Sequence, residues 1–69
     1  MGANAITYKE NGYEAILVEY NVRTKEDEIV KGFYHLEEAE KWVEDQSLHY
    51  QQSGLFEIMT VDEAIEKGL

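Results

Sequence analysis

Carboxylates are the side chains of this sequence whose type and spacing could do chemistry. Glu37, Glu40 and Glu44 are spaced i, i+3 and i+7, so in a helix they line one stripe about 10 Å long. Glu38 and Asp45 are also seven residues apart and form a neighbouring row. Such rows repeat negative charge at spacings comparable to those of backbone phosphates. They predict binding to a basic protein surface.

A second acidic group, Glu26, Asp27 and Glu28, lies in a predicted turn. The whole chain has 15 Asp and Glu residues against 6 Lys and Arg residues, a net charge of -9 on 69 residues. A magnitude of about 2 to 8 suits the solubility of a small domain. Because nucleic acid and anionic lipid repel such a chain, we expect it to bind neither of them directly. The predicted partner is a protein with a basic surface.

Part of this charge has an ordinary explanation. The dipole of a helix favours acids in its first turn, and Glu37, Glu38, Asp62 and Glu63 all lie where helices are predicted to begin. For any single residue of the set, a solvated helix face is the better explanation, although such a face usually mixes both signs of charge. Both explanations stay open. The excess that the dipole leaves unexplained comprises Glu40, Glu44 and Asp45, together with the three acids of the turn.

In size, charge, lack of cysteine and apolar content, the chain resembles the small acidic inhibitors made by phages and mobile elements. These proteins act as nucleic-acid mimics, for example against restriction or CRISPR enzymes. The resemblance is one of class, because no residue motif identifies a family. It implies a non-enzymatic inhibitor that docks into a basic, nucleic-acid-binding cleft.

Catalytic and metal-binding patterns are absent from the sequence. His35 and His49 lie at opposite ends of a predicted helix, and Ser47 and Ser53 lack a nucleophile-elbow context. There is no phosphate-cradling Gly-rich loop, no H-E-x-x-H pattern and no cysteine. The acidic turn lacks the spacing of a calcium loop. We therefore predict that the protein is not an enzyme and has no cofactor and no metal site.

The hydrophobic pattern predicts a small α+β fold in the order β-β-β-α-β-α. The predicted elements are strands at Ala5–Glu10, Tyr13–Arg23 and Glu28–Tyr34, a long helix at Leu36–Gln52, a strand at Leu55–Thr60 and a short helix at Val61–Lys67. Asn11-Gly12 predicts a hairpin turn that pairs Lys9 with Glu14. Thr24–Asp27 predicts the second turn. The result is an antiparallel three-stranded meander plus a fourth strand, in two layers with the long helix. At the last helix, Thr60 and Glu63 form a capping box.

Strand parity predicts two apolar sheet faces. One face comprises Ile16, Val18, Tyr20, Val22, Ile29 and Phe33; the other comprises Ile6, Tyr8, Tyr13, Ala15, Leu17, Val30 and Tyr34. The long helix covers one face, and the short helix covers the other through Val61, Ala64 and Ile65. If the short helix is too small, Tyr8, Tyr13 and Tyr34 form an exposed patch that suits an interface. The alternative function is therefore a self-associating homodimer or accessory subunit in which acidity serves solubility.

A chain of 69 residues predicts a single domain over 1–69, with a flexible N-terminus at 1–4. No segment approaches the roughly 20 apolar residues of a membrane helix. The N-terminus has neither the basic region nor the apolar region of a signal peptide. We therefore expect a cytoplasmic protein with no membrane partner.

Overall fold

Three antiparallel strands form the sheet on which the other elements pack. In the computed structural model, which describes residues 4–69, they are β1 (Ala15–Asn21), β2 (Glu26–Phe33) and β3 (Phe56–Thr60). β1 lies in the centre, between β2 and β3. The apolar run 15–18 is buried throughout, as a strand covered on both faces requires.

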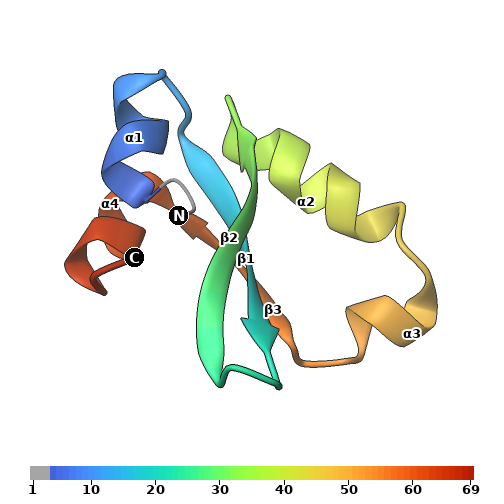
Figure 1. Ribbon diagram of the computed structural model, residues 1–69. Helices are drawn as coiled ribbons and strands as arrows, with labels where there is room; N and C mark the ends of the chain where they lie inside the picture. Colours follow the sequence, from blue (N-terminus) through green and yellow to red (C-terminus); the bar gives the residue numbers. More distant parts are fainter. Residues whose placement is uncertain (1–3) are drawn as a thin grey trace.

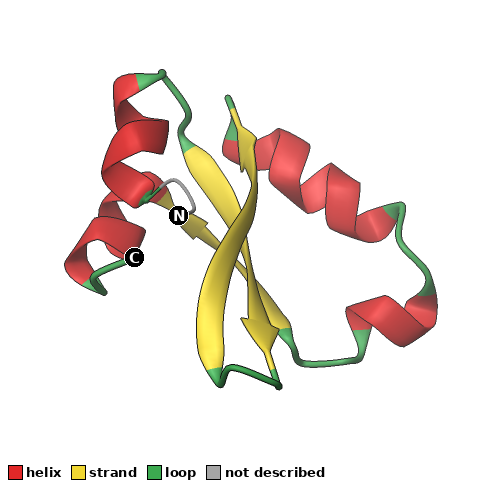
Figure 2. Cartoon of the chain, in the orientation of Figure 1, coloured by secondary structure: helices red, strands yellow, loops and turns green. Residues whose placement is uncertain are grey.

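Helices cover both faces of this sheet (Figure 1). α1 (Ala5–Glu10) and α4 (Val61–Glu66) lie on one side, and α2 (Leu36–Glu44) and α3 (Leu48–Gln51) on the other. The predicted α+β fold is confirmed, and Figure 2 shows the strands between two helical layers instead of beside one. Within residues 4–69, no helix is long and apolar enough to cross a bilayer.

The predicted first strand is wrong, because residues 5–10 form α1. The Asn4 side chain caps this helix by accepting a hydrogen bond from the Thr7 amide at 3.0 Å. Asn11 and Gly12 close its C-terminal end, and Gly12 has a φ of 88° that suits glycine. The same Asn-Gly pair that predicts a hairpin therefore ends a helix.

Helix α1 also changes the predicted contacts of the N-terminal region. Lys9 does not face Glu14; its Nζ lies 2.7 Å from Oδ1 of Asp62 on α4. Of the segment 1–4 that we predicted to be flexible, Asn4 is the N-cap of α1, and residues 1–3 lie outside the described residues.

Two hydrophobic clusters fill the space on either side of the sheet. The α1/α4 side holds Ala5, Ile16, Val18, Met59, Val61 and Ala64, with Ile29 and Ile65 packed against them. The α2/α3 side holds Ala15, Leu17, Phe33 and Ala39, with Leu36, Trp42, Phe56 and Ile58. The prediction that the last helix covers one face through Val61, Ala64 and Ile65 is confirmed.

Both predicted sheet faces contained errors. Tyr8 and Tyr13 pack against the cluster of Ile16 and Val18 instead of sharing a face with Leu17. The second error is at Phe33. The pairing of β1 with β2 shifts between Leu17, which faces Lys31, and Val18, which faces Ile29. The extra residue on β2 is Val30, and a bulge of this kind inverts the parity of the later residues in the strand. Phe33 therefore packs with Leu17 instead of Ile16.

The predicted long helix at 36–52 is two helices. α2 ends at Glu44, and Ser47 starts α3 by accepting a hydrogen bond from the Tyr50 amide at 3.2 Å. The Gln51 amide group donates to the Gln46 carbonyl at 2.9 Å and holds the corner. Because of the break, Trp42 of α2 and Tyr50 of α3 both pack against the sheet. Their ring centroids are 5.8 Å apart.

The capping box at α4 is confirmed. The Thr60 hydroxyl accepts a hydrogen bond from the Glu63 amide at 3.2 Å. The Thr60 hydroxyl also donates a hydrogen bond to the Glu63 carboxylate at 3.4 Å. This start places α4 directly after β3.

Candidate functional site

The acidic stripe lies on the exposed flank of α2. Glu37, Glu40 and Glu44 are exposed, while the other side of the helix packs Ala39 and Trp42 against the sheet. The side-chain carboxylates of these three residues make no hydrogen bond or salt bridge within residues 4–69. Lys41, which i, i+4 spacing could pair with Glu37, forms no ion pair in this part of the chain. The stripe therefore presents uncompensated negative charge to solvent.

Asp45 extends this acidic surface to the C-terminal end of α2. Asp45 is the C-cap of the helix and is exposed, next to Glu44 in the last turn. The negative end of the helix dipole disfavours acids here, and Lys41 is the basic residue of that turn. Glu44 and Asp45 are thus the two predicted helix acids that lie where the dipole disfavours negative charge.

The three acids predicted in a turn lie instead at the start of β2. The β1–β2 turn comes earlier, because the Asn21 side-chain oxygen accepts hydrogen bonds from the Arg23 amide at 2.9 Å and the Thr24 amide at 3.2 Å. Glu26, Asp27 and Glu28 are exposed, but strand alternation sends Asp27 to the opposite face from the two glutamates. The structure therefore splits this group.

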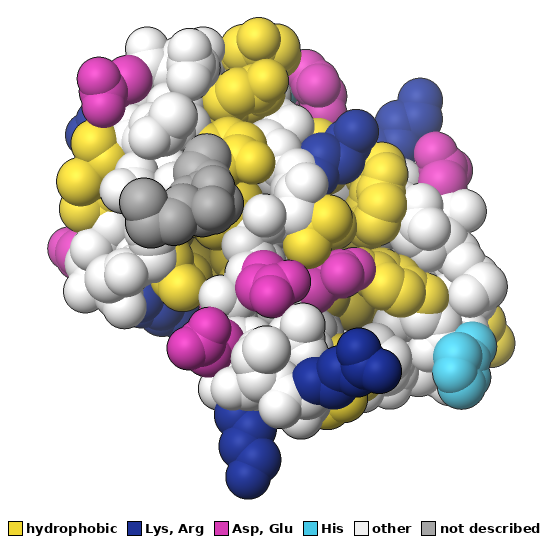
Figure 3. All heavy atoms as spheres, viewed as in Figure 1, with side chains coloured by type: hydrophobic (Ala, Val, Ile, Leu, Met, Phe, Trp, Pro, Cys, Tyr) yellow, Lys and Arg dark blue, Asp and Glu magenta, His cyan; other side chains and the backbone are white. Residues whose placement is uncertain are grey.

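The acids of β2 and the stripe of α2 are two separate surfaces. Glu37 and Glu40 border a hollow with Glu14 and His35, whereas Glu28 borders one at the other end of β1, beside Asn21. Within residues 4–69, no hydrogen bond or ion pair joins the two groups. On the face drawn in Figure 3, carboxylates lie among hydrophobic and basic side chains.

Glu19 is an acidic residue of interest that sequence reasoning missed. It is half-buried on β1, directly opposite Glu28 of β2. The Tyr50 hydroxyl donates a 2.7 Å hydrogen bond to its Oε2. Burial, followed by this bond and the negative charge of Glu19, raises the pKa of Tyr50 to about 12. The sequence did contain a signal, because Glu19 is a single acid directly after the apolar run 15–18 of the central strand.

Tyr8, Tyr13 and Tyr34 are brought together, but not on a bare sheet face. The Tyr13 and Tyr34 rings stack with centroids 4.5 Å apart, and Tyr8 lies 5.4 Å from Tyr13. Tyr8 belongs to α1 and is half-buried, and Tyr34 is 54% exposed. The neighbouring Tyr13 side chain is the main cause that raises the pKa of Tyr34. Self-association through this group stays a prediction.

The predicted absence of catalytic and metal sites also stays a prediction. His35 lies before α2, where its Nδ1 is 3.8 Å from Oε2 of Glu14, and His49 lies on α3. Among residues 4–69, no group of three metal-ligating side chains could hold an ion. No buried side-chain polar atom in this part of the chain lacks a hydrogen-bond partner.

Comparison with known proteins identifies no relative. No protein-family model matches the chain, and it matches neither a curated protein nor a solved structure.

Proposed function

We propose that this protein is a small, non-enzymatic binding protein that presents carboxylates to the basic, nucleic-acid-binding surface of a protein partner. The observation that supports the proposal is the exposed stripe of Glu37, Glu40 and Glu44, which has no basic partner within residues 4–69. In its specific form, the protein is an inhibitor that occupies a cleft otherwise filled by nucleic acid.

Internal ion pairs leave most of the charge uncompensated. Among residues 4–69, three carboxylates lie within 4 Å of a basic side chain: Asp62 beside Lys9, Glu14 beside His35, and Glu57 beside Lys67. The chain has 15 acidic residues, and the others contribute to a long-range negative field that would draw a basic partner toward the molecule. An affinity of this origin falls as salt rises, because salt screens exposed charges.

The positions of several acids favour binding over simple solubility. Glu44 and Asp45 lie at the C-terminal end of α2, where the dipole disfavours them. Glu19 and Glu28 lie opposite each other on adjacent strands, where like charges destabilise a sheet. Solubility depends on the total charge, so the acids could lie at positions where they do not lower stability. Binding to a partner requires negative charge at particular positions. The proposed setting is the cytoplasm, which the cysteine-free composition suits.

Charge reversal on α2 tests this proposal. The wild-type protein, a Glu40→Lys/Glu44→Lys variant and a control Glu10→Lys/Glu66→Lys variant are each immobilised, exposed to host extract at low salt and eluted with a salt gradient. Both variants change the net charge equally, and the control residues are exposed on α1 and α4. We expect nucleic-acid-binding proteins to bind the wild type and the control but not the α2 variant.

Competition with nucleic acid completes this test. If the partner uses its nucleic-acid cleft, free duplex DNA or RNA should release it from the wild-type protein. Retention of the same proteins by the α2 variant, or release by salt but never by nucleic acid, would contradict the proposal.

A further inference from the structure

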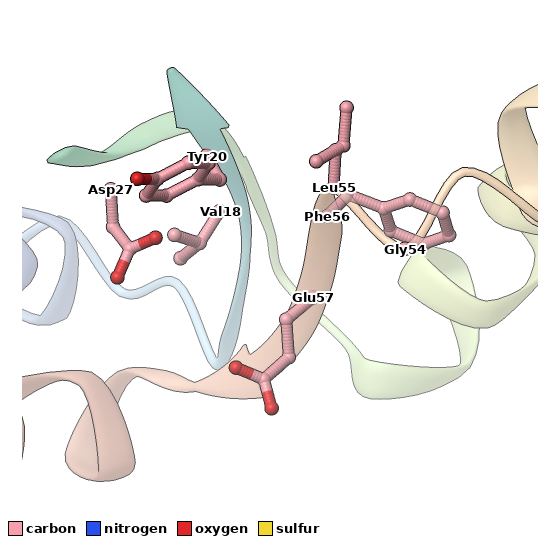
Figure 4. A pocket seen from close by; sticks show the side chains of 7 residues that line it. All are labelled: Val18, Tyr20, Asp27, Gly54, Leu55, Phe56 and Glu57. Carbon is pink, nitrogen blue, oxygen red and sulfur yellow. The ribbon is translucent and has the colours of Figure 1, made fainter. Parts of the chain in front are cut away.

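The end of the sheet near the β1–β2 turn carries an open hollow of about 310 Å³. Its lining comes from β1, β2 and the region where β3 begins, and is drawn in Figure 4: Val18, Tyr20, Asp27, Gly54, Leu55, Phe56 and Glu57. Strand pairing explains why these residues meet. Tyr20 faces Asp27 across β1 and β2, and the Tyr20 amide donates to the Leu55 carbonyl at 2.8 Å.

This hollow exists because the helices on that side are short. α1 and α4 have six residues each, or about 9 Å of helix, whereas the seven residues of β1 extend about 23 Å. The helices cover the end that holds Ile16 and Met59. At the other end, Tyr20 is 41% exposed and Leu55 is 46% exposed.

Asp27 supplies an unpaired carboxylate at the rim of the hollow. Its side chain makes no hydrogen bond or ion pair within residues 4–69. The second rim carboxylate, that of Glu57, lies 3.6 Å from Lys67 Nζ. Figure 4 shows Tyr20 and Asp27 together on one wall, with Leu55 on the opposite wall. The hollow thus combines the apolar side chains of Val18 and Leu55, the aromatic ring of Tyr20 and the unpaired carboxylate of Asp27.

We propose that this hollow binds an arginine side chain of the basic protein partner. The planar guanidinium would stack on the Tyr20 ring and form two parallel hydrogen bonds to the Asp27 carboxylate. The aliphatic part of the arginine would pack against Val18 and Leu55. Lysine lacks the planar fork, so it would pair with Asp27 without the stacking geometry. The inference rests on the proposed function, because it names the anchor through which a basic partner binds.

A peptide titration followed by amide chemical shifts tests the anchor. The probe is a blocked pentapeptide with one central arginine between glycines, compared with the same peptide carrying lysine or neutral citrulline. At about 0.15 M salt, screening beyond about 8 Å suppresses diffuse attraction. We expect saturable shifts at Tyr20, Asp27 and Leu55 with arginine, weaker binding with lysine and none with citrulline.

Two variants and a matched control sharpen this test. Asp27→Asn should weaken arginine binding by about tenfold, the effect of losing a charge-assisted hydrogen bond. Tyr20→Leu keeps apolar bulk and should remove the preference for arginine over lysine. Glu66→Gln on α4 removes the same charge as Asp27→Asn and should leave binding unchanged. The amide spectrum of each variant shows that it is folded.

The outcomes separate this inference from the proposed function. Shifts confined to the amides of α2 would overturn the anchor and leave the proposed function standing. Equal binding of the arginine and citrulline peptides, or no shift with any peptide, would also overturn the anchor. The charge-reversal capture experiment decides the proposed function independently of these results.

Discussion

Glu19 and Glu28 lie directly opposite each other on β1 and β2, although both are acidic. The Glu19 carboxylate accepts a hydrogen bond from the Tyr50 hydroxyl, and Glu28 Oε1 accepts one from the Asn21 amide group at 3.3 Å. Each acid therefore has its own neutral donor, but neither has a cation within 4 Å among residues 4–69. The chain therefore keeps two negative charges at opposed positions of the sheet, where their repulsion lowers stability.

Neutralising Glu28 should stabilise the protein. Glu28→Gln removes the repulsion from Glu19 and keeps an oxygen that can accept from Asn21, so we expect a gain of about 0.2 to 1 kcal/mol. Glu26→Gln is the control, because Glu26 faces Asn21 and has no acid opposite it. Urea unfolding of both variants measures the change. A loss of stability in Glu28→Gln, with Glu26→Gln unchanged, would show that the pair does not repel.

Removing the Tyr50 hydroxyl should destabilise the protein. Tyr50→Phe leaves the half-buried Glu19 carboxylate without its protein donor, at a cost of about 1 kcal/mol. Tyr20→Phe serves as the control, because the Tyr20 hydroxyl makes no hydrogen bond within residues 4–69. Thermal or urea unfolding distinguishes them. Equal effects in the two variants would rule out a contribution from the Tyr50–Glu19 bond.

Burial of Tyr50, together with its bond to Glu19, predicts a pH dependence of stability at the alkaline end. Folding raises the pKa of Tyr50 from 10.0 to about 12, so the folded protein holds this proton more tightly than the unfolded chain. The resulting stabilisation is complete below about pH 10 and is lost as pH rises from about 10 to 12. Wild type should therefore lose more stability than Tyr50→Phe across this window in urea unfolding. Parallel losses in the two proteins would refute the prediction.

Gly32 should not tolerate a side chain. A Cβ at this position would lie 2.7 Å from Cδ1 of Tyr8 and 2.8 Å from Cδ1 of Tyr13. Gly32→Ala should therefore displace the two rings and cost about 1 to 3 kcal/mol of unfolding free energy. Asp27→Ala, at an exposed residue of the same strand whose side chain makes no hydrogen bond or ion pair within residues 4–69, should change stability little. An unaltered unfolding midpoint in Gly32→Ala would mean that the rings move aside freely.

The sequence was sufficient to predict the sheet core and the last helix. The run 15–18 is apolar without alternation, which only a doubly covered strand explains well. The Thr60–Glu63 capping box and Gly68 mark the two ends of α4 by specific chemistry, and Gly68 has a φ of 81°. At both ends of α4, the boundary predicted from side-chain chemistry agreed with the structure.

The errors lie where one pattern fits two structures. Six residues at 5–10 are too few to separate a period of 2 from a period of 3.6, and Asn-Gly suits both a hairpin and a helix end. The bulge at Val30 cannot be recognised in the residue pattern, so Phe33 was assigned to the wrong face of the sheet. The turn set by Asn21 moved Glu26 and Asp27 from a loop into a strand.

The candidate site was predicted in part for the same reasons. Helical spacing was enough to place Glu37, Glu40 and Glu44 together on α2, because that period is local. The Tyr50–Glu19 bond and the hollow beside Tyr20 join residues far apart in the chain. Such contacts depend on strand register and on the break between α2 and α3, neither of which the local pattern contains.

Displacement of nucleic acid tests the central claim most directly. The captured partner is bound to fluorescent duplex DNA or RNA, and this protein is added while fluorescence anisotropy is recorded. We predict that wild type and Glu10→Lys/Glu66→Lys release the nucleic acid, while Glu40→Lys/Glu44→Lys releases little. If wild type binds the partner and the nucleic acid stays bound, the carboxylate surface does not occupy the nucleic-acid cleft, and the account is wrong.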